Sequence, residues 1–146
     1  MRFWDSSALL PLLVPEARSD QLVALMRSDP AAAVWWATPV ECASALARLE
    51  REGRLAEADR STAAERLGRA ARGWTEVPPI ERVRDQATRL LRLHALRAAD
   101  ALQLGAALVL ADFEPRTLPF VTLDAQLGAA AGREGFEVLG LEKPTR

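Results

Sequence analysis

The sequence predicts an α/β fold in which helices cover both faces of a parallel sheet. Short apolar, β-branched or aromatic segments alternate along the chain with longer segments of helical periodicity, and this alternation is typical of such folds. The 146 residues are 49% hydrophobic and 27% charged, which is an ordinary globular composition. Because no Gly/Ser/Pro-rich linker or charge block divides the chain, we expect a single domain spanning residues 1–146.

Five segments have the composition of short buried strands. They are residues 2–4, 32–36, 74–77, 120–122 and 136–139. Between them, apolar residues at helical spacing predict seven helices. The helices are expected at residues 8–14, 16–27, 38–52, 55–72, 80–94, 97–111 and 124–131. The third and fourth of them follow each other without a strand between them, so we expect a helical hairpin that projects from the sheet.

Serine, threonine and proline signals mark where two of these helices begin. Ser6 and Ser7 precede the first helix and suggest a serine cap. Thr38, Pro39 and Glu41 form the full start signature of the third helix, with threonine as the cap and glutamate three residues later.

The formal net charge of −1 argues against a strongly basic nucleic-acid binder. Eighteen of the nineteen basic residues are arginine, which is the better bidentate partner for phosphate, although GC-rich coding DNA gives the same bias. If several acids gather in one site, the remaining surface is net basic. The overall charge therefore does not exclude a nucleic-acid substrate.

The cysteine count and the hydropathy pattern predict a cytoplasmic protein. Cys42 is the only cysteine, which excludes an intrachain disulfide and fits a reducing compartment. No segment approaches the roughly 20 apolar residues of a membrane span. Asp5, Pro11 and Pro15 interrupt the early apolar segment, so it does not read as a signal peptide. One histidine, His94, and one cysteine cannot make a typical zinc site.

Four acids occupy comparable places in the predicted fold. Asp5, Glu41 and Asp124 each follow a strand, and Asp100 lies near the start of the helix that leads into the fourth strand. All four should therefore lie at the carboxyl edge of the sheet, where open α/β sheets bind ligands. Two carboxylates 4 Å apart repel by about 4 kcal/mol at an effective dielectric of 20. A hard divalent cation would remove that cost and could activate water for attack on a phosphodiester.

Each acid also has a purely structural explanation. Asp5 and Asp124 could cap the helices that follow them. Glu41 could be the capping-box partner of Thr38, and Asp100 could pair with Arg97 three residues earlier. These explanations stay open for each acid taken alone, whereas four acids on one rim are far less expected by chance.

Four segments together resemble the motifs of PIN-domain ribonucleases, most closely the VapC-type toxins of bacterial toxin–antitoxin pairs. They are Asp5-Ser6-Ser7, Thr38-Pro39-Val40-Glu41, Leu96-Arg97-Ala98-Ala99-Asp100-Ala101-Leu102-Gln103 and Phe120-Val121-Thr122-Leu123-Asp124. Each motif is weak by itself, but their order and spacing match over essentially the whole chain.

The resemblance implies more than the residues alone establish. It implies a PIN-like sheet in the order 3-2-1-4-5 and Mg²⁺ or Mn²⁺ held by four catalytic acids. It also implies endonucleolytic cleavage of RNA, a homodimer, and inhibition by a cognate antitoxin protein. Two hydroxyls, Ser6 and Thr122, match positions that would hydrogen-bond a metal ligand or a water. The four acids are Asp5, Glu41, Asp100 and Asp124.

Two other function classes remain as alternatives. A phosphatase-like domain could use Asp5 as a nucleophile, but Ser7 stands where that chemistry wants a second aspartate. A non-catalytic interaction module would use the acids only as caps. The hairpin carries an arginine-rich surface that is either a solvated face or a contact surface for RNA or antitoxin. Its arginines are Arg48, Arg51, Arg54, Arg60, Arg66, Arg69 and Arg72.

Overall fold

The computed structural model describes residues 1–142, and its centre is a five-stranded parallel sheet in the order β3-β2-β1-β4-β5. Every pair of neighbouring strands runs parallel. The strands are β1 (Arg2–Trp4), β2 (Ala32–Trp35), β3 (Thr75–Val77), β4 (Phe120–Val121) and β5 (Val138–Leu139). The α/β fold class and the strand order that the resemblance implied are both confirmed.

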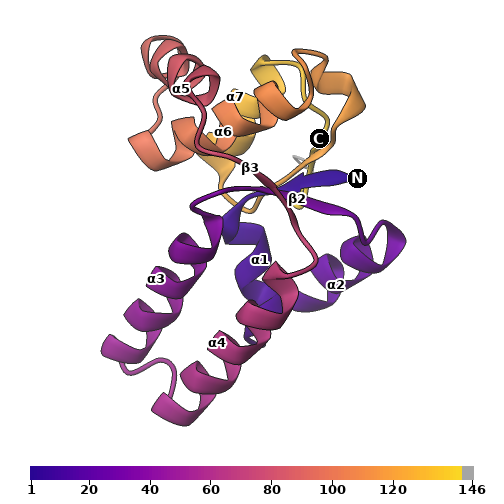
Figure 1. Ribbon diagram of the computed structural model, residues 1–146. Helices are drawn as coiled ribbons and strands as arrows, with labels where there is room; N and C mark the ends of the chain where they lie inside the picture. Colours follow the sequence, from indigo (N-terminus) through magenta and orange to yellow (C-terminus); the bar gives the residue numbers. More distant parts are fainter. Residues whose placement is uncertain (143–146) are drawn as a thin grey trace.

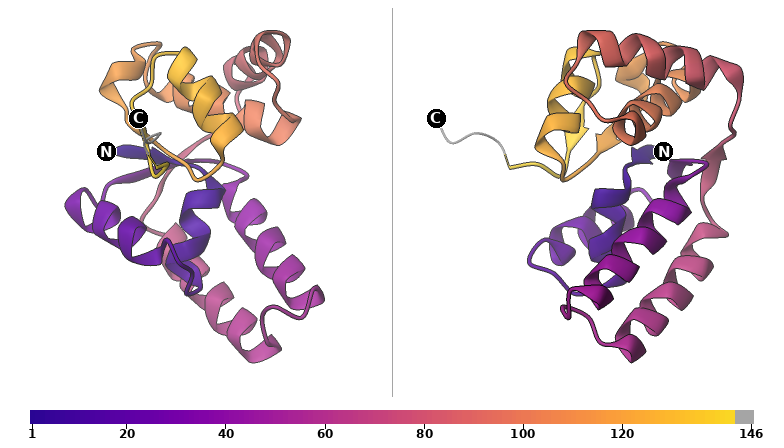
Figure 2. Two further views of the ribbon diagram at one scale, coloured as in Figure 1. Left: turned by 180° about the vertical axis from the view of Figure 1, so that it is seen from behind. Right: turned by 90° about the vertical axis from the view of Figure 1, so that its left-hand side faces the viewer.

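Helices cover both faces of the sheet (Figures 1 and 2). One layer consists of α1 (Ser6–Leu13), α2 (Ser19–Ser28), α3 (Thr38–Arg51) and α4 (Glu57–Ala71). The other consists of α5 (Glu81–Leu93), α6 (Ala98–Leu110) and α7 (Ala125–Arg133). Among the described residues, no helix is long and apolar enough to cross a membrane.

Strand β1 supplies a side chain to each of two hydrophobic cores. Successive residues of a strand point to opposite faces, so Phe3 and Trp4 enter different cores, and both are fully buried. Phe3 stacks on Phe120 with ring centroids 5.3 Å apart on the side of α5, α6 and α7. Trp4 packs among residues of α1 to α4. Burial of each aromatic side chain contributes about 1.5–3 kcal/mol and fixes β1 at the centre of the sheet.

Helices α3 and α4 form the predicted hairpin and extend away from the sheet (Figure 1). Leu46 of α3 and Leu67 of α4 are buried in the same core. The turn between the helices contains Gly53 at φ 70°, a left-handed conformation that favours glycine. Arg60 Nε lies 2.6 Å from Glu50 Oε2 and joins the two helices by an ion pair.

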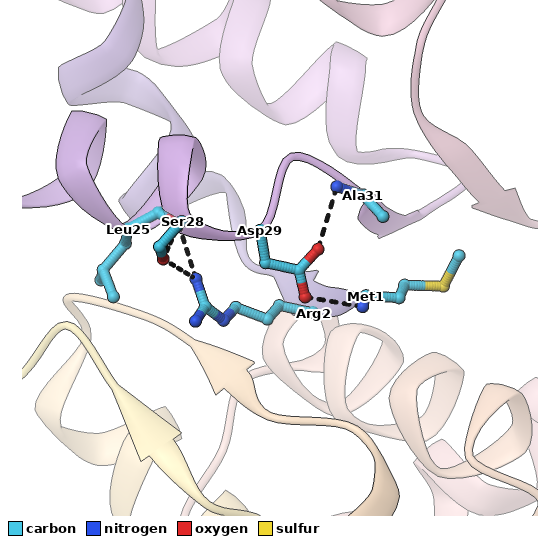
Figure 3. A network of polar contacts seen from close by, with 6 residues as sticks. All are labelled: Met1, Arg2, Leu25, Ser28, Asp29 and Ala31. Carbon is cyan, nitrogen blue, oxygen red and sulfur yellow. Dashed lines mark hydrogen bonds and ion pairs between the residues drawn. The ribbon is translucent and has the colours of Figure 1, made fainter.

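The N-terminal end of β1 is tied to the end of α2 by polar contacts (Figure 3). The amino group of Met1 lies 2.7 Å from Asp29 Oδ2. Arg2 Nη1 donates to the carbonyl of Leu25 at 2.6 Å and to Ser28 Oγ at 2.8 Å. These contacts hold β1 in register before it reaches the carboxyl edge.

Three details of the sequence expectation were wrong. Asp5 rather than a serine caps α1, through its bond with Ser7 N–H. Helix α2 begins at Ser19 rather than residue 16, because residues 16–19 form a turn in which Glu16 N–H donates to Ser19 Oγ at 2.8 Å. The strands are also shorter than expected; β5 begins at Val138, two residues late, because Phe136 N–H bonds to Ala131 O after α7.

Candidate functional site

The candidate site lies where β1 and β4 end side by side. These strands are neighbours in the sheet, but the chain continues from them to opposite sides, from β1 to β2 and from β4 to β5. Such a switch point leaves a crevice beyond the strand ends. Asp5 follows β1 directly, and Asp124 follows β4 after two residues. Asp5 N–H bonds to Val121 O at 3.0 Å, which fixes the backbone of Asp5 against β4.

The Asp5 carboxylate is only 3% exposed and is surrounded by hydroxyl donors. Its Oδ2 accepts hydrogen bonds from Ser7 Oγ and from Thr122 Oγ1, the latter at 2.9 Å. Ser7 N–H also donates to Oδ2, at 3.3 Å, so the carboxylate is the N-cap of α1 as well. The same carboxylate is therefore both the helix cap and the predicted site residue. Its other oxygen, Oδ1, has only a long contact with Ser6 Oγ, at 3.4 Å.

Glu41 is brought to Asp5 by Ser6. Ser6 Oγ donates to Glu41 Oε2 at 2.9 Å, and Gln103 Nε2 donates to the same oxygen at 2.9 Å. Thr38 does not form the predicted capping box with Glu41: α3 begins at Thr38 itself without a side-chain cap, and Thr38 Oγ1 instead accepts from Gln103 Nε2 at 3.1 Å. The capping-box explanation of Glu41 was therefore wrong.

Asp124 and Asp100 complete the set of predicted acids at greater separation. Asp124 caps α7, with Oδ1 accepting from Leu127 N–H at 2.9 Å. Its own N–H donates to Thr122 Oγ1 at 3.0 Å, which links it to Asp5 through one hydroxyl. Asp100 lies in the first turn of α6 and has no side-chain hydrogen bond to the other three acids. Arg97 does not come within 4.0 Å of it as an ion pair.

The four acids interact electrostatically. Burial raises the pKa of the Asp5 carboxyl above its ordinary value, and the Asp124 charge adds to this. Burial also raises the pKa of Glu41, as do the charges of Asp5 and Asp100. The pKa of Asp100 is raised by burial first and then by the charges of Asp124 and Asp5. Among residues 1–142, no Arg, Lys or His nitrogen lies within 4.0 Å of any of the four.

The donor chemistry of this site fits a hard divalent cation. All four predicted ligands are carboxylates, and their neighbours are hydroxyls and one amide, which are the oxygen donors that Mg²⁺ and Mn²⁺ prefer. A cation would also relieve the repulsion that raises the pKa values. As the side chains stand, no group of three or more His, Cys, Asp or Glu residues within the described chain is arranged to hold a metal ion.

Two residues at the site were not assigned there from the sequence. Ser7, interpreted as a cap, donates to Asp5 through Oγ and accepts from Leu123 N–H at 3.0 Å. Gln103 is fully buried and holds both Thr38 and Glu41. Its only sequence signal is a long polar side chain in an apolar helix, three residues after Asp100 and therefore on the same face.

Cys42 follows Glu41 in α3 but belongs to the core. It is fully buried, and burial raises the pKa of its thiol to about 12. Such a thiol is almost entirely protonated at neutral pH, so it cannot act as a nucleophile there.

The chain is similar to several solved structures along most of its length. The first is a chain of a toxin–antitoxin complex from Klebsiella pneumoniae, with 16% identity, a TM-score of 0.63, and coverage of 100% of this chain and 99% of that one. The second is PAE2754 from Pyrobaculum aerophilum, with 24% identity, a TM-score of 0.60, and coverage of 88% and 78%. The third is FitAcB from Neisseria gonorrhoeae, with 19% identity, a TM-score of 0.64, and coverage of 94% and 96%.

The likeness is one of fold. All three identities are below 25%, so the shared α/β architecture is what these structures establish. No protein-family model matches the sequence, and no curated protein is significantly similar to it. Function must therefore be inferred from the site itself.

Proposed function

We propose that the chain is a cytoplasmic, metal-dependent endoribonuclease of the PIN-domain type that acts as the toxin of a toxin–antitoxin pair. The observation that carries the proposal is the Asp5 carboxylate, 3% exposed at the β1–β4 switch point and charge-coupled to another acid, Asp124. Burial of a carboxylate without a cationic partner is costly, and a bound metal would offset the part of that cost that hydrogen bonds leave. The fold-level likeness to a chain of a toxin–antitoxin complex supports the biological role.

Each group at the site has a distinct role in this proposal. Asp5, Glu41, Asp100 and Asp124 would hold Mg²⁺ or Mn²⁺, which supplies charge stabilisation and an activated water for phosphodiester hydrolysis. Thr122 and Ser7 orient Asp5 by donating to Oδ2. Because those donors occupy Oδ2, Oδ1 is the oxygen less engaged by the protein.

The cleavage test uses a pool of single-stranded RNA oligonucleotides with Mg²⁺, Mn²⁺ or EDTA. We expect cleavage with either metal, none in EDTA, and a loss of at least about 100-fold in Asp5→Asn, because a metal ligand is removed. Asparagine is as good an N-cap as aspartate, so the variant keeps the cap of α1. Asp20→Asn on the exposed face of α2 is the matched control and should cleave like the wild type.

Two outcomes would contradict the nuclease proposal. Full activity in Asp5→Asn would show that this acid site does not catalyse the cleavage. Absence of cleavage in every metal, together with a covalent phosphate trapped on Asp5, would favour the phosphatase-like alternative. In cells, growth arrest by the wild type that is relieved by a co-expressed neighbouring open reading frame would establish the toxin–antitoxin role.

The surface that suits an antitoxin is an apolar groove of about 510 Å³ between α1, α2 and α4. Leu13, Met26 and Trp74 line it, together with two exposed arginines, Arg27 and Arg69. Apolar lining with exposed cations fits an amphipathic antitoxin segment that carries acidic side chains beside its apolar face. Arg69→Glu should weaken antitoxin rescue in cells, whereas Arg84→Glu on α5 should not; equal rescue in both would contradict this location.

We also propose that the protein is a homodimer. Trp36 is 53% exposed and Ile80 is 42% exposed, and Trp36 N–H bonds to Val77 O, three residues before Ile80. Exposed large apolar side chains at neighbouring strand ends suit a contact with a second copy. Light scattering should show a dimer that Trp36→Lys dissociates; a wild-type monomer at micromolar concentration would contradict it.

A further inference from the structure

A second groove begins at the acid site and runs between α1 and α3. Its volume is about 530 Å³. At the end near the acids it is lined by Ser6, Ser7 and Glu41, and further along α3 by Ser44 and Arg48. The groove therefore joins one candidate catalytic carboxylate, Glu41, to an arginine of the hairpin.

Three polar residues of α3 line this groove at helical spacing. Glu41, Ser44 and Arg48 stand at positions i, i+3 and i+7, which share one face of a helix. At 1.5 Å per residue, Arg48 lies about 10 Å along the axis from Glu41. A stacked nucleic-acid strand rises about 3.4 Å per nucleotide, so this separation corresponds to about two or three nucleotides.

Arg48 has no acidic partner among the described residues, unlike two other arginines of the hairpin. Arg54 lies 3.7 Å from Glu52, and Arg60 lies 2.6 Å from Glu50. Within residues 1–142, no carboxylate comes within 4.0 Å of Arg48, whose side chain is exposed. The bland explanation is a cation in the last turn of α3, which favours the helix dipole. Arg51 satisfies that explanation equally well but does not line the groove.

We propose that Arg48 binds a backbone phosphate of single-stranded RNA two or three nucleotides from the scissile bond, with the strand lying in the groove between α1 and α3. This inference rests on the proposed nuclease function and adds a positioning residue to it. The guanidinium group forms paired hydrogen bonds with phosphate, which suits the backbone of a single strand that lies along the groove. Arg48 would then fix the register of the substrate without touching the reacting atoms.

Kinetics on a fluorogenic oligoribonucleotide test the proposal. Arg48→Ala should raise KM roughly tenfold with kcat within about twofold, because a charge-assisted contact to the bound strand is lost. The slope of log affinity against log salt should fall in magnitude by about 0.7, the contribution of one phosphate on a single strand. Arg48→Lys should keep that slope, and Arg51→Ala is the matched control expected to behave like the wild type.

Neutral linkages locate the phosphate directly. Substrates with one methylphosphonate at each position around the cleavage site should show a binding loss at the second or third linkage on one side in the wild type. In Arg48→Ala the same substitution should cost nothing further, as in a double-mutant cycle. Two results would overturn the proposal. One is a methylphosphonate that weakens binding by Arg48→Ala as much as it weakens binding by the wild type. The other is an effect of Arg48→Ala no larger than that of Arg51→Ala.

RNA binding by Arg48 can be tested separately from the nuclease function. Fluorescence anisotropy in EDTA measures RNA binding without cleavage, so it tests Arg48 even if no cut is observed. Cleavage by the wild type with KM and salt slope unchanged in Arg48→Ala would reject only the role of Arg48. A lack of both cleavage and RNA binding would reject the nuclease proposal and this inference together.

Discussion

Replacement of the buried Gln103 by leucine tests how Glu41 is held. Leucine has similar size and removes both hydrogen bonds of Gln103 Nε2, to Glu41 Oε2 and to Thr38 Oγ1. A bond to a charged group contributes about 1.5–3 kcal/mol and a neutral one about 0.5–1.5 kcal/mol. The substitution also removes Gln103 Oε1, a buried oxygen without a partner, which recovers about 1–3 kcal/mol. The expected net loss of unfolding free energy is about 1–2 kcal/mol.

Replacement of Gln103 by leucine should also raise the pKa of Glu41. The Gln103 bond lowers the pKa of Glu41 against the stronger effect of burial, so its loss raises that pKa further. Urea unfolding at pH 7 measures the stability, and an NMR titration of Glu41 measures the pKa. Gln126→Leu on the exposed face of α7 is the control, with an expected change within about 0.5 kcal/mol. A Gln103→Leu protein with wild-type stability and an unmoved Glu41 titration would refute the reasoning.

Two further predictions concern charge. Asp100→Asn should stabilise the metal-free protein at pH 7 by less than about 1 kcal/mol, because burial and the charge of Asp124 raise the pKa of this partly exposed acid. Because the pKa of Asp100 is higher in the folded than in the unfolded protein, the wild type loses stability as the pH rises through these two pKa values. The stability gain of Asp100→Asn should therefore vanish in unfolding curves measured at a pH below both values. Burial alone would raise the pKa of Glu134, but hydrogen bonds from Arg89 and His94 outweigh it and lower the pKa. Glu134→Gln should therefore destabilise by about 0.5–1 kcal/mol at pH 7, and thermal melts should show the difference fading as pH falls through the folded pKa; an unchanged gap would contradict the ion pair.

The architecture could be predicted from the sequence because its signals are local. Phe3 and Trp4 are large, adjacent and apolar, so a short buried strand was the natural interpretation. Element ends were less accurate, since they depend on tertiary bonds such as that of Phe136 N–H to Ala131 O. The order 3-2-1-4-5 came from the resemblance, because no residue pattern specifies which strands become neighbours.

The sequence placed the acids of the candidate site, and the resemblance added the hydroxyls of Ser6 and Thr122, which bond to Glu41 and Asp5, but the contacts of Ser7 and Gln103 were missed. The rule that parallel strand ends share an edge placed Asp5 and Asp124 on one rim. No such rule assigns partners to Ser7 or Gln103, whose bonds join residues 2 to 116 positions apart. Glu41 shows the limit of local patterns most clearly. The residues around it indicated a capping box with Thr38, whereas its carboxylate accepts a hydrogen bond from Gln103, a buried residue of a distant helix.

The central claim is that the four acids form a divalent-cation site, and isothermal titration of Mn²⁺ into the metal-free protein tests it most directly. We expect saturable binding in the wild type and in Asp20→Asn, loss of that binding in Asp5→Asn, and a matching rise in the melting temperature only in the proteins that bind. Absence of saturable binding in the wild type, or equal binding in Asp5→Asn, would contradict the claim.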